Sequence, residues 1–245
     1  MERVYRRLMH PSDLTVFRVV VGETDLWVAA QGDLSRLVAE RVGFHRRQLR
    51  AYMLRDPGFA AALAPREALP EAPLVVARMI AAAALAGVGP MAAVAGAIAQ
   101  AVGEDLRAES PELILENGGD VFVRSSLPRT VAVLAGGSPL SGRIGVALPP
   151  CPEGLGVCTS AGTVGHSLSF GRADAAMVIA EDAAVADAIA TALGNRLRTP
   201  SDLEEAVSWA ARRPSVRGAL AVMGRHLAAA GAIELISLEE GSVVP

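Results

Sequence analysis

The sequence predicts an α+β protein whose sheet is antiparallel or mixed. Short apolar segments follow one another between residues 111 and 181 with turn residues between them, as in strands joined by hairpins. Segments with helical spacing of apolar residues lie before and after this part of the chain. Hydrophobic residues make up 51% of the 245 residues, against 20% charged, so the chain buries a large core. We predict a single domain over residues 1–245, with a hairpin and helix sub-region at 1–72.

The N-terminal part is predicted to form a hairpin, a helix and a connection that packs onto the core. Residues 15–30 are rich in β-branched side chains on both sides of Gly-Glu-Thr-Asp at 22–25, which favours a hairpin. From Asp33, a suitable N-cap, apolar residues recur with a period near 3.6 and predict an amphipathic helix. Prolines mark the connection at 57–73, in which three apolar residues are expected to pack down: Phe59, Leu63 and Leu69.

Residues 79–99 carry no charge over about the length that crosses a bilayer. Alanine contributes little transfer free energy, however, and Gly87 to Pro90 interrupts the segment. Neither a basic cluster nor an aromatic belt flanks it. We therefore predict two short buried alanine-rich helices and no membrane association.

The second half of the chain predicts several strands and two more helices. The segments predicted as strands are PELILENGGDVFVRS, RTVAVLAGG, GRIGVALPP, GLGVCTSAGTV and DAAMVIAE. Helices are predicted from Ala183 to about Leu193 and around Leu203 to Ala229. The segment AIELISLE closes the chain as a final strand.

The charge pattern excludes several functions. The net charge is −3 and aromatic residues are 4% of the chain, which suits neither nucleic acid nor an anionic membrane. All 23 basic residues are arginines, which excludes Walker-type phosphate binding and lysine chemistry. Arg46 and Arg50 are interpreted as part of a solvated helix face, with one arginine that reaches a ligand or a partner subunit as the alternative. Cys151 and Cys158 match no zinc or redox spacing and no secretory signal precedes them, so we expect free thiols in a cytoplasmic protein.

The segment ENGGD at 116–120 joins two predicted strands. Asn-Gly is a strong hairpin signal because both central residues of a type I′ turn need positive φ. That signal does not explain the two carboxylates that flank the turn. The alternatives are a plain hairpin and a turn that binds a cation, a sugar hydroxyl or a phosphate-bound metal. The ligand-binding candidates here are Glu116, Asn117, Gly118, Gly119 and Asp120.

A second candidate segment is GVCTSAGTVGHSLSF, residues 156–170. Its glycines let backbone approach a ligand closely, and its hydroxyl groups donate and accept hydrogen bonds without bulk. The alternatives are a turn-rich connection and a hydrolase triad of Ser160, His166 and Asp174, although no Gly-x-Ser-x-Gly elbow is present. The candidates for binding a polar small molecule are Thr159, Ser160, Gly162, Thr163 and Ser167.

The segment from Asp182 to Asn195 predicts a largely buried helix with Asp182 as its N-cap and a stop at Gly194-Asn195. Asp187 and Thr191 are four residues apart and share one face. A buried Asp is costly unless it is paired or binds a cation, and a divalent metal with oxygen ligands would satisfy it. The alternative is an exposed Asp with Thr191 bonded back to its own helix.

Taken in order, ENGGD, GVCTSAGTVGHSLSFGRADA and ADAIATALGNR resemble uncharacterised protein family 0280, which is similar in fold to the ApbE flavin transferases. AGVGPMAAVAGAIA resembles the same branch, so the resemblance covers most of the chain from Thr15 onward. It implies an ApbE-like α+β fold. ApbE proteins bind FAD and use a magnesium ion to move FMN onto a threonine of a target protein.

The resemblance also implies site residues. Asn117, Gly118 and Gly119 stand near the Asn-x-Gly-Gly turn of the ApbE proteins in altered order. Thr159, Ser160 and Gly162 resemble the ApbE Thr-Ser-Gly stretch with Ala161 inserted. Asp187 and Thr191 resemble the Asp and Thr that serve the metal in ApbE proteins. The His-x-x-Asp-Pro-x-x-Gly segment of the ApbE proteins has no match, and GHSLSFGRAD stands in its place.

The resemblance therefore implies a small-molecule site for FAD, FMN or another phosphorylated ligand, with magnesium at Asp187 and Thr191. Asp187 and His166 are the candidate catalytic residues, and FMN transfer is the implied reaction. One alternative is a non-flavin enzyme or accessory protein of sulfur assimilation that depends on Cys158 or His166. Another is a ligand-binding protein without turnover. The large apolar content favours a homodimer.

Overall fold

The computed structural model describes residue 6 and residues 11–162 and 171–238. Its larger sheet has eight strands in the order β1-β2-β3-β4-β7-β8-β9-β10, and a smaller sheet has the order β11-β6-β5. All paired strands are antiparallel. The prediction of an α+β fold with an antiparallel sheet is confirmed.

The larger sheet consists of β1 (Thr15–Val21), β2 (Thr24–Ala30), β3 (Leu113–Asn117), β4 (Asp120–Ser125), β7 (Cys151–Ser160), β8 (Ala175–Ala180), β9 (Val216–Met223) and β10 (His226–Gly231). The smaller sheet consists of β5 (Arg129–Ala132), β6 (Ile144–Leu148) and β11 (Glu234–Ser237). The helices are α1 (Ser35–Arg55), α2 (Leu74–Ala86), α3 (Val94–Asp105), α4 (Ala183–Arg196) and α5 (Leu203–Ala211), with short 3₁₀ turns η2 (Pro90–Ala93) and η3 (Pro200–Asp202).

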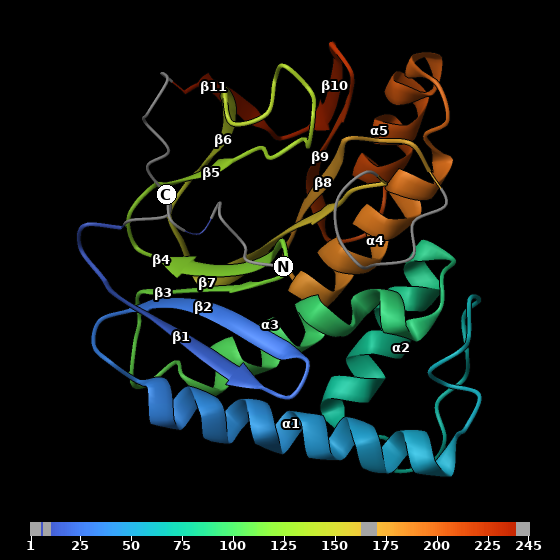
Figure 1. Cartoon of the computed structure of the whole chain (residues 1–245). Coiled ribbons are helices and arrows are strands. Elements are labelled where there is room, and N and C mark those ends of the chain that lie inside the picture. Colours follow the sequence, from blue (N-terminus) through green and yellow to red (C-terminus); the bar gives the residue numbers. More distant parts are fainter. Residues whose placement is uncertain (1–5, 7–10, 163–170, 239–245) are drawn as a thin grey trace.

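The helices cover one face of the larger sheet, and the smaller sheet lies over the other face (Figure 1). Side chains alternate between these faces along each strand. In β3, Leu113 and Leu115 join the core beneath the helices, whereas Ile114 joins the core shared with Val146 and Leu148 of β6. Any polar residue on a strand can therefore be assigned to one of two layers.

The predicted N-terminal hairpin is confirmed, since β1 and β2 pair up to Val21 opposite Thr24. Helix α1 has Leu34 as its N-cap, while the Asp33 carboxylate accepts the Ser35 N–H at 2.9 Å. The prediction for Leu63 was wrong, because 65% of this residue is exposed. The backbone here packs closely on Gly89 instead, where an added Cβ would lie 1.7 Å from the Ala62 carbonyl oxygen and 3.1 Å from Leu63 Cα.

Phe59 and Leu69 do pack onto the core beneath the helices, as predicted. The uncharged segment at 79–99 forms parts of α2 and α3, separated by η2, and both helices contribute many residues to that core. Within the part of the chain described, no helix by itself has the length and apolar composition to cross a bilayer. Residues 74–86 and 90–105 have this length and composition only when the two helical segments are taken together, and the direction of the chain bends by 105° between them.

The predicted helix from Leu203 to Ala229 was wrong beyond Ala211, where α5 ends. Pro214 lacks the N–H that a continuing helix needs, and Ser215 has a positive φ of 63°. The alanine-rich residues that follow form the β9–β10 hairpin instead. Alanine favours a helix locally, but β9 is buried between neighbouring strands, and this tertiary context decides its conformation. The final strand, β11, is confirmed and pairs with β6.

Candidate functional site

The turn between β3 and β4 is the first part of the candidate site. Gly118 and Gly119 have φ values of 76° and 104°, as a two-residue hairpin turn requires. The Gly119 N–H donates to Glu116 Oε1 at 2.7 Å, and the Gly119 carbonyl accepts the Thr159 N–H of β7 at 3.2 Å. The turn is thus fixed both by its own strand and by the neighbouring strand.

Strand alternation divides the ENGGD segment between the two faces of the sheet. Asn117 lies on the helix face, where its side-chain amide donates to the Ala95 carbonyl of α3 at 3.2 Å. Asp120 lies opposite Cys158 in register and shares this face. Glu116 lies on the other face, opposite Trp27 of β2, and is 1% exposed. Of the two carboxylates that flank the turn, only that of Asp120 therefore lies on the face that the helices cover.

The end of β7 runs beside α4. Cys158 faces α4, and its thiol donates to the Ala183 carbonyl at 3.3 Å. Two residues further on, the Ser160 hydroxyl oxygen would lie 3.4 Å from a Cβ added at Gly194 of α4. The alternation of the strand places Thr159 on the opposite face, although its backbone holds the turn. Ser160, rather than Thr159, directs its hydroxyl toward the helix.

Helix α4 begins after the predicted N-cap, because Asp182 accepts the N–H groups of Ala184 and Val185. It continues to Arg196, one residue beyond the predicted stop at Gly194-Asn195. Asp187 is 9% exposed, so the alternative of an Asp on an exposed stripe does not hold. Thr191 is half-buried one turn further along the same face.

Asp187 packs against the start of α3. Its Oδ2 accepts the Gly96 N–H at 2.9 Å, and the amide of Ala95 contributes a further hydrogen bond. Burial raises the pKa of Asp187 from 3.8 to about 7, because these two amides only partly offset the loss of water. The carboxyl group is thus poised between its neutral and charged forms near neutral pH.

Cys158 lies between the two carboxylates of this face. Burial raises the pKa of its thiol well above the usual range, and the charges of Asp120 and Asp187 raise it further. The side chain is fully buried. A thiol that stays protonated and out of reach of solvent is a poor nucleophile, which argues against chemistry that depends on Cys158.

Both cysteines are expected to resist modification in the folded protein. Cys151 is also free and buried, and burial raises its thiol pKa. Titration with a thiol-reactive dye at pH 7.5 should find almost no reactive thiol in the native protein and two per chain in denaturant. Rapid reaction of one native thiol would contradict the burial of these side chains.

Three predicted site residues, Thr163, His166 and Ser167, lie outside the described residues. The hydrolase triad depends on His166 and stays a prediction. A hydrogen bond connects the residues before and after the segment 163–170, because the Gly162 N–H donates to the Ala173 carbonyl at 2.9 Å. Asp174 accepts the Gly224 N–H at 2.7 Å and so contacts the β9–β10 turn.

The donors around Asp187 can be compared with what a magnesium ion needs. Within residues 11–162 and 171–238, no group of three or more His, Cys, Asp and Glu side chains is placed to hold a metal. Mg²⁺ is, however, commonly bound by one or two carboxylates together with phosphates of the substrate. One buried carboxylate and one hydroxyl, Asp187 and Thr191, fit a magnesium ion that binds with a phosphorylated ligand. They do not form a complete cage by themselves.

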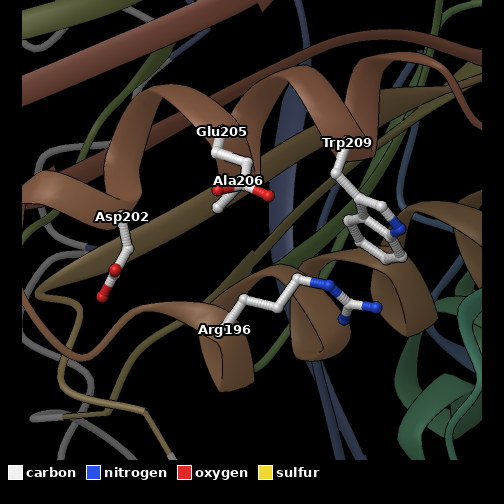
Figure 2. A pocket seen from close by; sticks show the side chains of 5 residues that line it. All are labelled: Arg196, Asp202, Glu205, Ala206 and Trp209. Carbon is white, nitrogen blue, oxygen red and sulfur yellow. The ribbon is translucent and has the colours of Figure 1, made fainter.

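A separate hollow of about 250 Å³ lies between the end of α4 and α5 (Figure 2). Its lining includes Arg196, whose guanidinium carbon stacks 3.5 Å from the centre of the Trp209 ring. Nine residues separate Arg196 from Asp187, a rotation of roughly 180° along a helix, so the two lie on opposite sides of α4. Asp202 at its edge already accepts the N–H groups of Arg198 and Thr199. This hollow is not part of the candidate site.

Sequence reasoning missed the residues of α3 that hold α4 in place. Gly96 lets the helices meet closely, since a Cβ there would lie 2.1 Å from the Ala183 carbonyl oxygen. Gln100 accepts the Ala183 N–H at 2.9 Å. A single amide side chain within an apolar helix is a signal that could have found Gln100, because a buried polar group needs a partner.

Comparison with known proteins places this arrangement in a family. A family model described as AbpE bacteria matches residues 6–222. A UPF0280 protein of Methanocella arvoryzae is 42% identical over 217 residues, which cover 88% of each chain. The chain belongs to the ApbE-like UPF0280 family. A UPF0280 protein of Methanopyrus kandleri is likewise 42% identical over 238 residues, covering 93% of this chain and 95% of the relative.

Solved structures show the fold of this UPF0280 chain at greater distance. The flavin transferase ApbE from Vibrio cholerae has a TM-score of 0.57 at 11% identity and covers 93% of this chain and 97% of its own. The apo form of the flavinyl transferase ApbE from Pseudomonas stutzeri has a TM-score of 0.52 at 14% identity, with coverages of 91% and 94%. The predicted family and ApbE-like fold are confirmed.

Proposed function

We propose that this UPF0280 protein binds a nucleotide-type ligand with a phosphate or pyrophosphate group, together with a magnesium ion at Asp187 and Thr191. FAD is the first candidate ligand because the protein shares its fold with flavin transferases. The observation that carries the proposal is the buried Asp187 carboxyl, which faces backbone amides rather than a basic side chain in the described structure. A cation would supply the positive counter-charge that stabilises the ionised Asp187 carboxylate.

The described residues support a division of roles at such a site. Asp187 and Thr191 would hold the metal from α4, and the glycine turn at 118–119 would approach the ligand with its backbone. When bound, magnesium neutralises part of the charge on the phosphates. Ser160 lies near Gly194 on the same side of β7 as Asp187 and offers a hydroxyl to a ligand oxygen.

FMN transfer is the reaction that we propose for this site. A hydroxyl oxygen of a target threonine would bond to the phosphorus of the FMN half, the pyrophosphate bond would break, and AMP would leave. The hydroxyl proton would pass to a base, for which His166 is the candidate while Asp187 holds the metal and Asp187 is the candidate if it does not. Positioning of the ligand and stabilisation of charge account for most of the catalysis in such reactions.

Isothermal titration with FAD, with and without magnesium, tests the proposal. We expect magnesium to tighten FAD binding by about tenfold or more in the wild type. Asp187→Asn should lose this dependence while keeping an acceptor for the Gly96 N–H. Glu181→Gln is the matched control, because Glu181 precedes the same helix but its side chain is 61% exposed.

The outcomes separate the alternatives. Equal FAD binding with and without magnesium in all three proteins would contradict the metal site. Absence of FAD binding would reject the flavin ligand and lead to a screen of other nucleotides and of sulfur metabolites. FAD binding without AMP release in the presence of threonine-containing target proteins would favour a ligand-binding protein without turnover, a candidate that the missing His-x-x-Asp-Pro segment supports.

A further inference from the structure

Arg6 reaches into the face of the sheet opposite the helices. Its Nε lies 2.5 Å from Glu116 Oε2, and its Nη1 lies 2.8 Å from Asp25 Oδ1. Nη2 also donates to the Asp25 carbonyl at 2.7 Å. The Arg6 side chain is 9% exposed and that of Glu116 is 2% exposed. One largely buried guanidinium thus bridges the buried Glu116 carboxylate and that of Asp25, whose side chain is 20% exposed.

Glu116 links this ion pair to the glycine turn. Its Oε2 accepts a hydrogen bond from Arg6 Nε, and its Oε1 accepts one from the Gly119 N–H at 2.7 Å. The Gly119 carbonyl in turn accepts the Thr159 N–H of β7. A continuous series of contacts therefore runs from Arg6 through Glu116 and the turn to the end of β7.

The turn depends on this support because its residues have few ways to stay rigid. Gly118 and Gly119 both adopt positive φ and lack side chains that would restrict them. Hydrogen bonds to a charged acceptor are stronger than those to a neutral one. Removal of Arg6 would take from the buried Glu116 carboxylate the guanidinium that contacts its Oε2, so the carboxylate would be held less firmly in place. A less firmly held carboxylate weakens the hydrogen bond that it accepts from the Gly119 N–H.

We propose that Arg6 is a positioning residue that holds the Asn117–Asp120 turn in place through Glu116, and that this turn sets the affinity of the ligand site. The second half of the proposal rests on the function proposed above. Arg6 acts from the opposite face of the sheet and does not itself contact the ligand.

Amide hydrogen exchange measured by NMR on the free protein tests the first half. We expect the Arg6→Gln variant to exchange the Gly119 amide about tenfold or more faster than the wild type, with a smaller increase at Thr159. Amides of β9, such as that of Leu220, should keep their rates. Arg6→Lys retains the positive charge but not the forked geometry and should give an intermediate rate, which covers a case in which Arg6→Gln folds poorly.

Arg18→Gln is the matched control. Arg18 also pairs with Asp25, with Nε at 2.8 Å from Oδ1, but its side chain is 63% exposed and on the surface. It shares the carboxylate of Asp25 with Arg6, so the variant removes an arginine contact to Asp25 and leaves the contact between Arg6 and Glu116 in place. We expect wild-type exchange at Gly119 in this variant.

Titration of the same variants with FAD and magnesium tests the second half. Affinity about tenfold weaker in Arg6→Gln, with Arg18→Gln unchanged, would support positioning. An unchanged Gly119 rate in Arg6→Gln would overturn the proposal, even if the variant melted at a lower temperature. Faster exchange with unchanged FAD affinity would overturn the link to the ligand site. If the wild type bound no FAD, the proposed function would fail, while the exchange rates would still decide whether Arg6 holds the turn.

Discussion

The Arg124→Met variant is expected to be less stable than the wild type by about 4 kcal/mol, the largest effect that we predict for a single side chain. Arg124 is 2% exposed. It donates to four backbone carbonyls at and beyond the end of α3, those of Gly103, Leu106, Ser110 and Pro111, at 2.7 to 3.2 Å. Methionine fills similar volume but donates to none of these carbonyls, of which that of Leu106 keeps the Ser110 N–H at 3.0 Å.

This effect also concerns the candidate site. The end of α3 is held by Arg124, while its beginning contacts Asp187 through Gly96. Urea unfolding followed by circular dichroism measures the difference. Arg107→Met is the control, since the Arg107 side chain is 51% exposed and pairs with Glu153, whose side chain is 86% exposed, and a change within about 0.5 kcal/mol is expected. Equal losses in both variants would show that the buried hydrogen bonds of Arg124 add nothing.

The second large effect is a pH-dependent difference in stability between the wild type and Asp187→Asn. The Asp187 pKa is about 7 in the folded chain, against an ordinary value of 3.8. A folded-state pKa that is raised means that the folded form binds the proton more tightly. The stability contributed by this group is therefore complete below pH ~4, is lost as the pH rises to ~7, and stays low above it. The full change corresponds to ~4 kcal/mol.

The variant does not titrate at this position, so its advantage over the wild type should grow between pH ~4 and pH ~7 and level off at higher pH. Urea unfolding at half-unit steps of pH measures it, with Glu181→Gln expected to run parallel to the wild type. Magnesium together with FAD should reduce the difference at pH 8, because a bound cation stabilises the charged form. Parallel curves for the wild type and Asp187→Asn would show that the carboxyl is not desolvated.

Much of the fold follows from local patterns in the sequence. The glycine turn at 118–119 requires positive φ, and Asp182 caps α4, because each depends on residues only a few positions apart. The failure at residues 216–229 has the opposite origin: alanine favours a helix locally, but β9 pairs with β8, which precedes α4 and α5 in the chain, and β10 then pairs with β9.

For the candidate site, the sequence by itself determined the family, the glycine turn and the one helix face shared by Asp187 and Thr191. Only the tertiary structure decided that Asp187 is buried against the Gly96 amide and that Cys158 lies between two carboxylates. It also decided that Glu116 lies on the opposite face of the sheet from Asp187 and Cys158. Arg6 and Glu116 are separated by 110 residues, and no local pattern relates them. The physical reason is that periodicity fixes the direction of a side chain relative to its own element, whereas burial and pKa depend on which other elements pack against it.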